Sequence, residues 1–170
     1  MKPRRMVCFD TGPLIWGIQQ RAHSSQQVMV DRTRRYIQHL SEENKRIMIP
    51  APVMAEYLAG FSDEVERETQ AQLLQKVFFI ASFDVKAAQI AAEIESNRTL
   101  VKQVRDEHRL NNAQISTDIQ IISIAVANSA EVIVAQDGQF EKLSQGRIIV
   151  IDVPSISEQL PLFRSAQNSN

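Results

Sequence analysis

Several features that would place this sequence in a secreted, membrane or cofactor-binding class are scarce. It has a single cysteine, so no disulfide can form within the chain. No apolar run approaches the roughly 20 residues that a membrane-spanning helix needs, and none has the length of a signal-peptide core. Only 5 glycines are present, and Gly12 stands alone in the first turn, which argues against the glycine-rich phosphate loop of dinucleotide-binding domains.

Charge of one sign is also lacking. The chain has 19 basic and 20 acidic residues, for a formal net charge of −1. This excludes a strongly basic coat for nucleic acid but leaves room for a local basic patch. Hydrophobic residues make up 44% of the 170 residues, enough for the core of one ordinary domain. We expect a cytoplasmic protein with one domain over residues 4–153 and a polar tail over 154–170.

Short apolar runs separated by helical segments predict the fold. Strands are expected at 7–9, 47–49, 77–80, 132–134 and 148–151. Runs without polar alternation, alternating with helices, indicate a parallel sheet covered on both faces. The prediction is an α/β fold, a Rossmann-like three-layer α/β/α sandwich with a five-stranded, mostly parallel sheet. The polar segment 96–116 is expected to prolong a helix and then form a loop.

Four acids are expected at one edge of this sheet. Asp10 and Asp137 follow strands, and Glu56 and Asp118 fall in the first turns of helices. Each also has a local interpretation as a helix cap, dipole partner or turn residue, and for Asp10 taken alone the cap is equally well supported. Four clustered carboxylates repel one another unless a cation neutralises them. Oxygen ligands suit Mg²⁺ or Mn²⁺, so the set favours a metal site.

Two other acid-dependent α/β families fit less well. Phosphatases of the haloacid dehalogenase type need a second Asp two residues after the first, where this chain has Gly12. Receiver domains need paired acids after the first strand, and Asp10 stands alone.

The segments around the four acids resemble those of the PIN-domain nucleases and, within them, the VapC-type toxins of bacterial toxin–antitoxin pairs. The matching segments are 10–15 (Asp-Thr-Gly-Pro-Leu-Ile), 56–60, 118–127 and 132–140, in that order. Two positions depart from the family pattern. Ala135 stands where Thr or Ser is frequent, and Gln139 stands where another acid is frequent.

The resemblance implies a PIN-like fold and divalent-metal-dependent hydrolysis of RNA phosphodiester bonds. Asp10 and Asp118 would be the main ligands of Mg²⁺ or Mn²⁺, and Asp137 would bind the metal directly or through water. Glu56 would complete the site or position the attacking water. Thr11 would hydrogen-bond behind the ligands, or would only begin a helix.

Ala135 and Gln139 support an alternative from another class. In that interpretation the protein is a catalytically weak PIN-like module that acts by binding RNA or a protein.

RNA also needs positive charge away from the metal. Arg98, Lys102, Arg105 and Arg109 are spaced four, three and four residues apart, so they would form one basic stripe if this segment is helical. The alternative is an ordinary solvated helix face.

Two further partners follow from the resemblance. An antitoxin protein would cover the acidic site, and a homodimer would form through residues 14–40. Tyr36, Ile37 and Leu40 are the expected dimer contacts.

Overall fold

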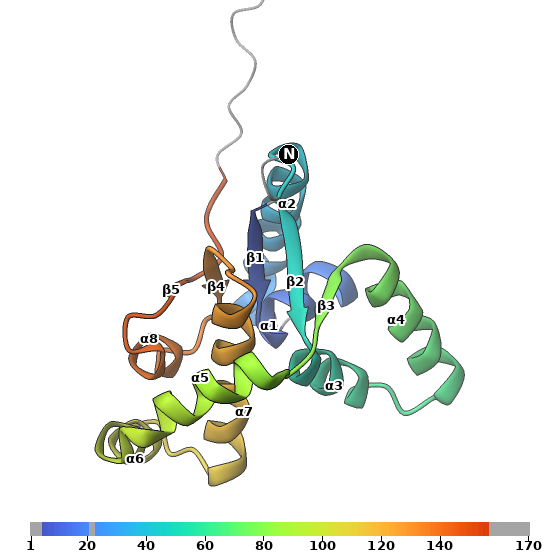
Figure 1. Ribbon diagram of the computed structural model, residues 1–170. Helices are drawn as coiled ribbons and strands as arrows, with labels where there is room; N and C mark the ends of the chain where they lie inside the picture. The colour runs from blue at the N-terminus through green and yellow to red at the C-terminus, as the bar shows by residue number, and fades with distance from the viewer. Residues whose placement is uncertain (1–4, 21–22, 157–170) are drawn as a thin grey trace, which may run out of the picture.

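Five parallel strands form one sheet in the order β3-β2-β1-β4-β5. The strands are β1 (Met6–Phe9), β2 (Arg46–Pro50), β3 (Phe79–Ala81), β4 (Val132–Val134) and β5 (Ile149–Ile151). The computed structural model describes residues 5–20 and 23–156 (Figure 1), so residue 4 of the expected domain and 157–170 of the expected tail lie outside the described residues. The predicted fold class is confirmed, and the sheet is entirely parallel.

Helices connect the strands and cover the sheet. They are α1 (Thr11–Leu14), η1 (Ile15–Gln19), η2 (Ser24–Gln26), α2 (Gln27–Glu42), α3 (Ala51–Ala59), α4 (Glu64–Val77), α5 (Val85–Ser96), α6 (Arg98–Glu107), α7 (Asn112–Ala127) and α8 (Gln139–Ser144). In Figure 1, α4 lies on the β3 side of the sheet and α8 on the β5 side. Within 5–20 and 23–156, no helix combines the length and apolar character needed to cross a membrane.

The central strand β1 is the point where the strand order reverses. Val7, Cys8 and Phe9 are at most 1% exposed, as expected for a strand flanked by two others and covered by helices. The chain adds β2 and β3 on one side of β1, and β4 and β5 on the other. Ligands of open α/β sheets bind at such a reversal, beyond the carboxyl ends of the strands. Here that position lies after β1 and β4.

The segment 96–116 was predicted to prolong a helix and then form a loop, and this prediction is wrong. The segment contains the separate helix α6 and the start of α7. The Asn97 side chain accepts a hydrogen bond from the Leu100 backbone N–H (3.3 Å) and starts a separate helix, α6. Asn111 and Gln114 form a reciprocal capping box that starts α7 at Asn112. Asp118 is therefore the seventh residue of its helix and not part of the first turn.

Two of the expected dimer contacts lie in the core of the chain itself. Tyr36 is 6% exposed and stacks on Phe9 with ring centroids 6.1 Å apart, and Leu40 is 1% exposed. A Cβ on Gly17 would lie 2.5 Å from Cδ1 of Ile37, so η1 packs closely against the half-buried Ile37 on α2. Tyr36 and Leu40 are thus wrong as dimer contacts, since helix periodicity turns them towards the sheet. The homodimer itself stays a prediction.

Candidate active site

Asp10 lies at the carboxyl end of β1 and is 9% exposed. Its backbone N–H donates to the carbonyl of Val134 at 3.0 Å, which holds the start of α1 beside the end of β4. Asp10 occupies the N-cap position of α1, but its side chain accepts no capping hydrogen bond. Capping therefore gives no sufficient reason to bury this carboxylate.

The pKa of Asp10 is raised from its ordinary value of 3.8 to about 7. Burial is the largest cause, and the charges of Asp118, Asp137 and Glu56 add to it, while a hydrogen bond from the Thr11 backbone N–H acts in the opposite direction. Among the residues that the structure describes, the charged groups that shift this pKa are all carboxylates. The structure thus brings the four predicted acids within electrostatic reach of one another.

Asp118 projects from α7 and is partly buried. Burial, followed by the charges of Asp137 and Glu56, raises its pKa to about 6. The Gln139 amide limits the increase, because its Nε2 donates to Oδ2 of Asp118 at 3.2 Å. Gln139 is 7% exposed at the start of α8, so this donor is fixed inside the site.

From the sequence, Gln139 stands out only as a departure from the family pattern. Its contact with Asp118, 21 residues earlier in the chain, joins α8 to α7, and no local pattern encodes that contact. The usable signal was that a neutral hydrogen-bond donor directly follows the Asp137–Gly138 turn.

Glu56 and Asp137 are more exposed than the other two acids. Glu56 is the sixth residue of α3, past the first turn in which it was expected. It accepts a hydrogen bond of 2.5 Å from the Thr11 hydroxyl at the start of α1. Thr11 therefore does more than begin a helix, because it connects the α3 acid to the turn that carries Asp10. Asp137 lies in the turn between β4 and α8.

The acids form an electrostatic cluster without a finished coordination shell. Among the described residues, no group of three or more His, Cys, Asp or Glu side chains is arranged to hold a metal ion. In this arrangement, water molecules would complete the coordination of an ion held by these carboxylates. Mg²⁺ is often bound in this way, with waters filling the other positions.

We predict that Gln139→Leu raises the pKa of Asp118 by about one unit. The reason is that a hydrogen bond to a charged group is worth about 1.5–3 kcal/mol and favours the ionised form. The measurement is an NMR titration of the Asp118 carboxyl carbon in chelator. Gln136→Leu is the matched control, since Gln136 is exposed between β4 and α8. An unchanged Asp118 titration in Gln139→Leu would contradict the contact.

The four predicted basic residues do not stay together. Three of them, Arg98, Lys102 and Arg105, belong to α6 and line the same pocket. Arg109 lies beyond the end of α6 with φ of 54°, so it leaves the helical face. Ala135, the second departure from the family pattern, is 5% exposed at the end of β4.

His108 borders the acid cluster although its sequence context gives no sign of it. A Cβ on Gly138 would lie 3.6 Å from Cε1 of His108, which places this ring against the residue that follows Asp137. An ion pair between Glu107 and Lys142 joins the same end of α6 to α8.

Comparisons with known proteins concern the family and the fold of this chain. The family model of the PIN domain matches residues 7–145. A comparison with curated proteins gives no match. A VapBC2 structure from Rickettsia felis, bound to a DNA fragment from its promoter, is similar at 16% identity with a TM-score of 0.60, over 86% of this chain and 98% of that one.

Two further structures are similar to the same extent. FitAcB from Neisseria gonorrhoeae has 19% identity and a TM-score of 0.58, over 86% of this chain and 97% of that one. DNA-bound VapBC from Salmonella typhimurium has 15% identity and a TM-score of 0.61, over 88% of this chain and 99% of that one. At such identities the likeness concerns the fold.

Proposed function

Since the chain belongs to the PIN-domain family, we propose that it is a divalent-metal-dependent endoribonuclease that hydrolyses RNA phosphodiester bonds at the acid cluster. The observation that carries this proposal is the burial of Asp10 among three other carboxylates, with no cation among the charges of residues 5–20 and 23–156 that shift its pKa. Such a cluster is costly unless a cation joins it. A phosphodiester is also an anion, so it can approach the carboxylates only with a cation between them.

The donor set fits Mg²⁺ or Mn²⁺, because it consists of carboxylate oxygens with two acids at its centre. Asp10 and Asp118 would hold the metal, and Asp137 would bind it directly or through water. A bound divalent ion would lower the pKa of a water molecule and stabilise the developing charge on the phosphate.

The remaining roles belong to groups around these ligands. Glu56, oriented by the Thr11 hydroxyl, would accept a proton from the attacking water. Gln139 would keep the Asp118 carboxylate ionised and in one orientation. Burial of Asp10 at the start of α1 would limit the water around the reacting phosphate.

The likeness to VapBC structures supports a finer proposal. The protein would be the toxin of a toxin–antitoxin pair, with an antitoxin protein as its inhibitor and a homodimer as its assembly. An enzyme with this substrate would act where RNA is abundant, in the cytoplasm.

The test is cleavage of a mixed tRNA and rRNA pool by purified protein in Mn²⁺ or Mg²⁺ and in chelator. Cleavage is expected only with metal, and Asp118→Ala is expected to reduce it by at least about 100-fold, the usual scale for a group that stabilises transition-state charge. Asp31→Asn is the matched control, because Asp31 is an exposed acid on α2. Full cleavage in chelator, or in Asp118→Ala, would contradict the proposal.

A second candidate function is favoured by two observations. The described acids do not form a three-ligand metal site, and one Asp118 oxygen is occupied by Gln139. A PIN-like module that binds RNA or a protein without cutting would fit both. Absence of cleavage by folded, inhibitor-free protein, together with retained RNA binding, would favour this function.

A further inference from the structure

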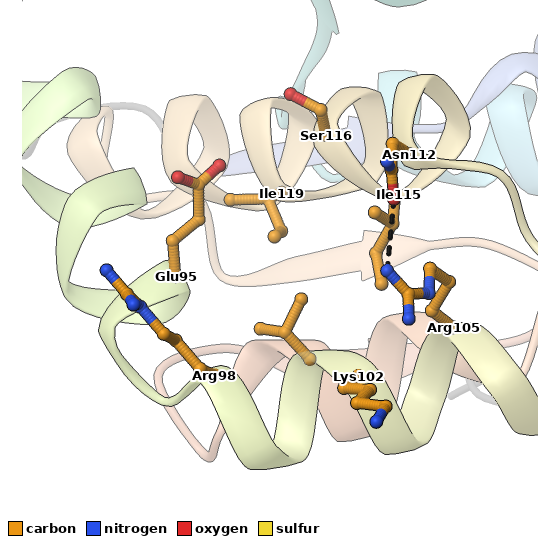
Figure 2. A pocket seen from close by; sticks show the side chains of 9 residues that line it. Glu95, Arg98, Lys102, Arg105, Asn112, Ile115, Ser116 and Ile119 are labelled. Atoms are coloured by element: carbon orange, nitrogen blue, oxygen red, sulfur yellow. Dashed lines mark hydrogen bonds between the residues drawn. The ribbon is translucent and has the colours of Figure 1, made fainter.

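A pocket of about 270 Å³ lies between α6 and α7, outside the acid cluster. Figure 2 shows Ile115 and Ile119 pointing from α7 towards α6, with charged side chains of α5 and α6 around them. Val101 completes an apolar floor with these two isoleucines. The pocket thus has an apolar floor and a charged rim.

The rim is basic. Arg98, Lys102 and Arg105 line it, and Glu95 is the single acid among its lining residues. Arg105 is already engaged, since its Nε lies 3.2 Å from Oδ1 of Asp106 and its Nη1 donates to Oδ1 of Asn112 at 3.1 Å.

Arg98 and Lys102 are the available cations of the pocket. Both side chains are exposed, and neither has an ion pair within the part of the chain that the structure describes. An exposed, unpaired cation keeps its capacity for a phosphate oxygen, and the apolar floor beside it suits a ring rather than another charge.

The pocket and the acid cluster share helix α7. Its α7 residues recur at one face of the helix, and Asp118 directly precedes Ile119 on the adjoining face. Two faces of one helix are separated by no more than its diameter, about 10 Å. At its other end α6 brings His108 against Gly138, beside Asp137.

We propose that this pocket holds one nucleotide of an RNA strand whose neighbouring phosphodiester lies at the acid cluster. The phosphate of that nucleotide contacts Arg98 and Lys102, and its base or ribose lies on Val101, Ile115 and Ile119. The proposal rests on the proposed function, because RNA is the polyanion that the acids would cut. An anionic strand repelled by four carboxylates needs nearby positive charge, and this pocket supplies it on the helix that carries Asp118.

The test measures binding without cleavage. Fluorescence anisotropy of a mixed-sequence single-stranded RNA is followed in chelator over a series of salt concentrations. Arg98→Ala/Lys102→Ala is compared with Arg34→Ala/Lys76→Ala, which removes two exposed cations from α2 and α4. Val101→Phe keeps every charge but fills the floor, and circular dichroism checks that each variant is folded.

We expect the Arg98→Ala/Lys102→Ala variant to lose affinity by on the order of tenfold. Its plot of log affinity against log salt should be shallower by about 0.7, the value for one phosphate contact to a single strand. Val101→Phe is expected to weaken binding without changing this slope. The Arg34→Ala/Lys76→Ala control is expected to bind as the unchanged protein does.

Two results would overturn the proposal. One is equal affinity of the Arg98→Ala/Lys102→Ala variant and its control. The other is binding of polyglutamate as tight as that of RNA and lost in the same variant, which would assign the pocket to an acidic protein segment. Cleavage with Mn²⁺ is measured separately. Pocket-dependent RNA binding without cleavage would thus refute the nuclease alone, and cleavage without pocket dependence would refute the pocket alone.

Discussion

Asp10→Asn is expected to stabilise the fold at pH 8 by about 2.6 kcal/mol more than at pH 5, while it removes RNA cleavage. The pKa of Asp10 is about 7 in the folded chain and 3.8 as its ordinary value, so the folded state binds this proton more tightly than the unfolded state does. A group of this kind contributes full stability below its unfolded pKa and loses that contribution as the pH rises through its folded pKa. Asparagine does not titrate and avoids the loss.

Urea unfolding in chelator at pH 5 and pH 8 measures this difference. The expected size follows from roughly two pKa units of linkage between these pH values. Asp31→Asn is the control, because it removes an exposed acid of α2. A pH-independent effect of Asp10→Asn on unfolding would mean that Asp10 is not held at a raised pKa.

The opposite signs of the two effects have a physical meaning. A buried carboxylate that destabilises its own fold persists for a reason other than folding, and sites of function carry such strain. Loss of cleavage together with increased stability would separate a functional role of Asp10 from a structural one.

Mn²⁺ is expected to raise the melting temperature of the unchanged protein by roughly 5 °C or more at pH 8. A ligand at 100 times its dissociation constant adds about 2.7 kcal/mol to the free energy of unfolding, and 1 kcal/mol corresponds to about 2–4 °C in a chain of this size. At pH 5 the effect should largely disappear, because protons then occupy Asp10 (pKa about 7) and Asp118 (pKa about 6).

Thermal unfolding of Asp118→Asn with and without Mn²⁺ tests whether this ion binds at the acid cluster. The variant is expected to lose most of the shift, whereas Asp31→Asn should keep it. An equal shift in Asp118→Asn would place the ion elsewhere. No shift in the unchanged protein would favour the non-cutting module proposed above.

The strands could be predicted from the sequence because each contains a short apolar run, although β5 is buried in part only. The predicted strand at 132–134 coincides with β4, and the run at 47–49 lies inside β2. Because β1 and β4 are parallel neighbours, their carboxyl ends lie at the same edge of the sheet. The sequence could therefore predict that Asp10 and Asp137 lie close together. Asp84 caps α5 in the structure, since its side chain accepts a hydrogen bond from the Ala87 backbone N–H.

The helix boundaries on the polar side were harder to predict. In 96–116 the apolar positions are few, so composition resembled a loop, although α6 buries Val104 completely. The start of α7 was signalled by Asn111 and Gln114 at capping-box spacing, but their reciprocal hydrogen bonds are visible only in the structure. The contact of Gln139 with Asp118 depends on how α8 packs on α7, which no single segment encodes.

The pairing of the central strand has a consequence for the order of events during synthesis. Val7 pairs with Val132, so β1 cannot complete its hydrogen bonds to β4 until the residues up to 134 have left the ribosome. Contacts of such long sequence separation form late, because the entropic cost of closing the intervening loop comes before the stabilisation that the contacts provide. Asp10 therefore meets Asp118 and Asp137 only after the residues up to 137 have been made and have left the ribosome. A nascent chain would carry no assembled acid site beside the ribosomal RNA that surrounds it.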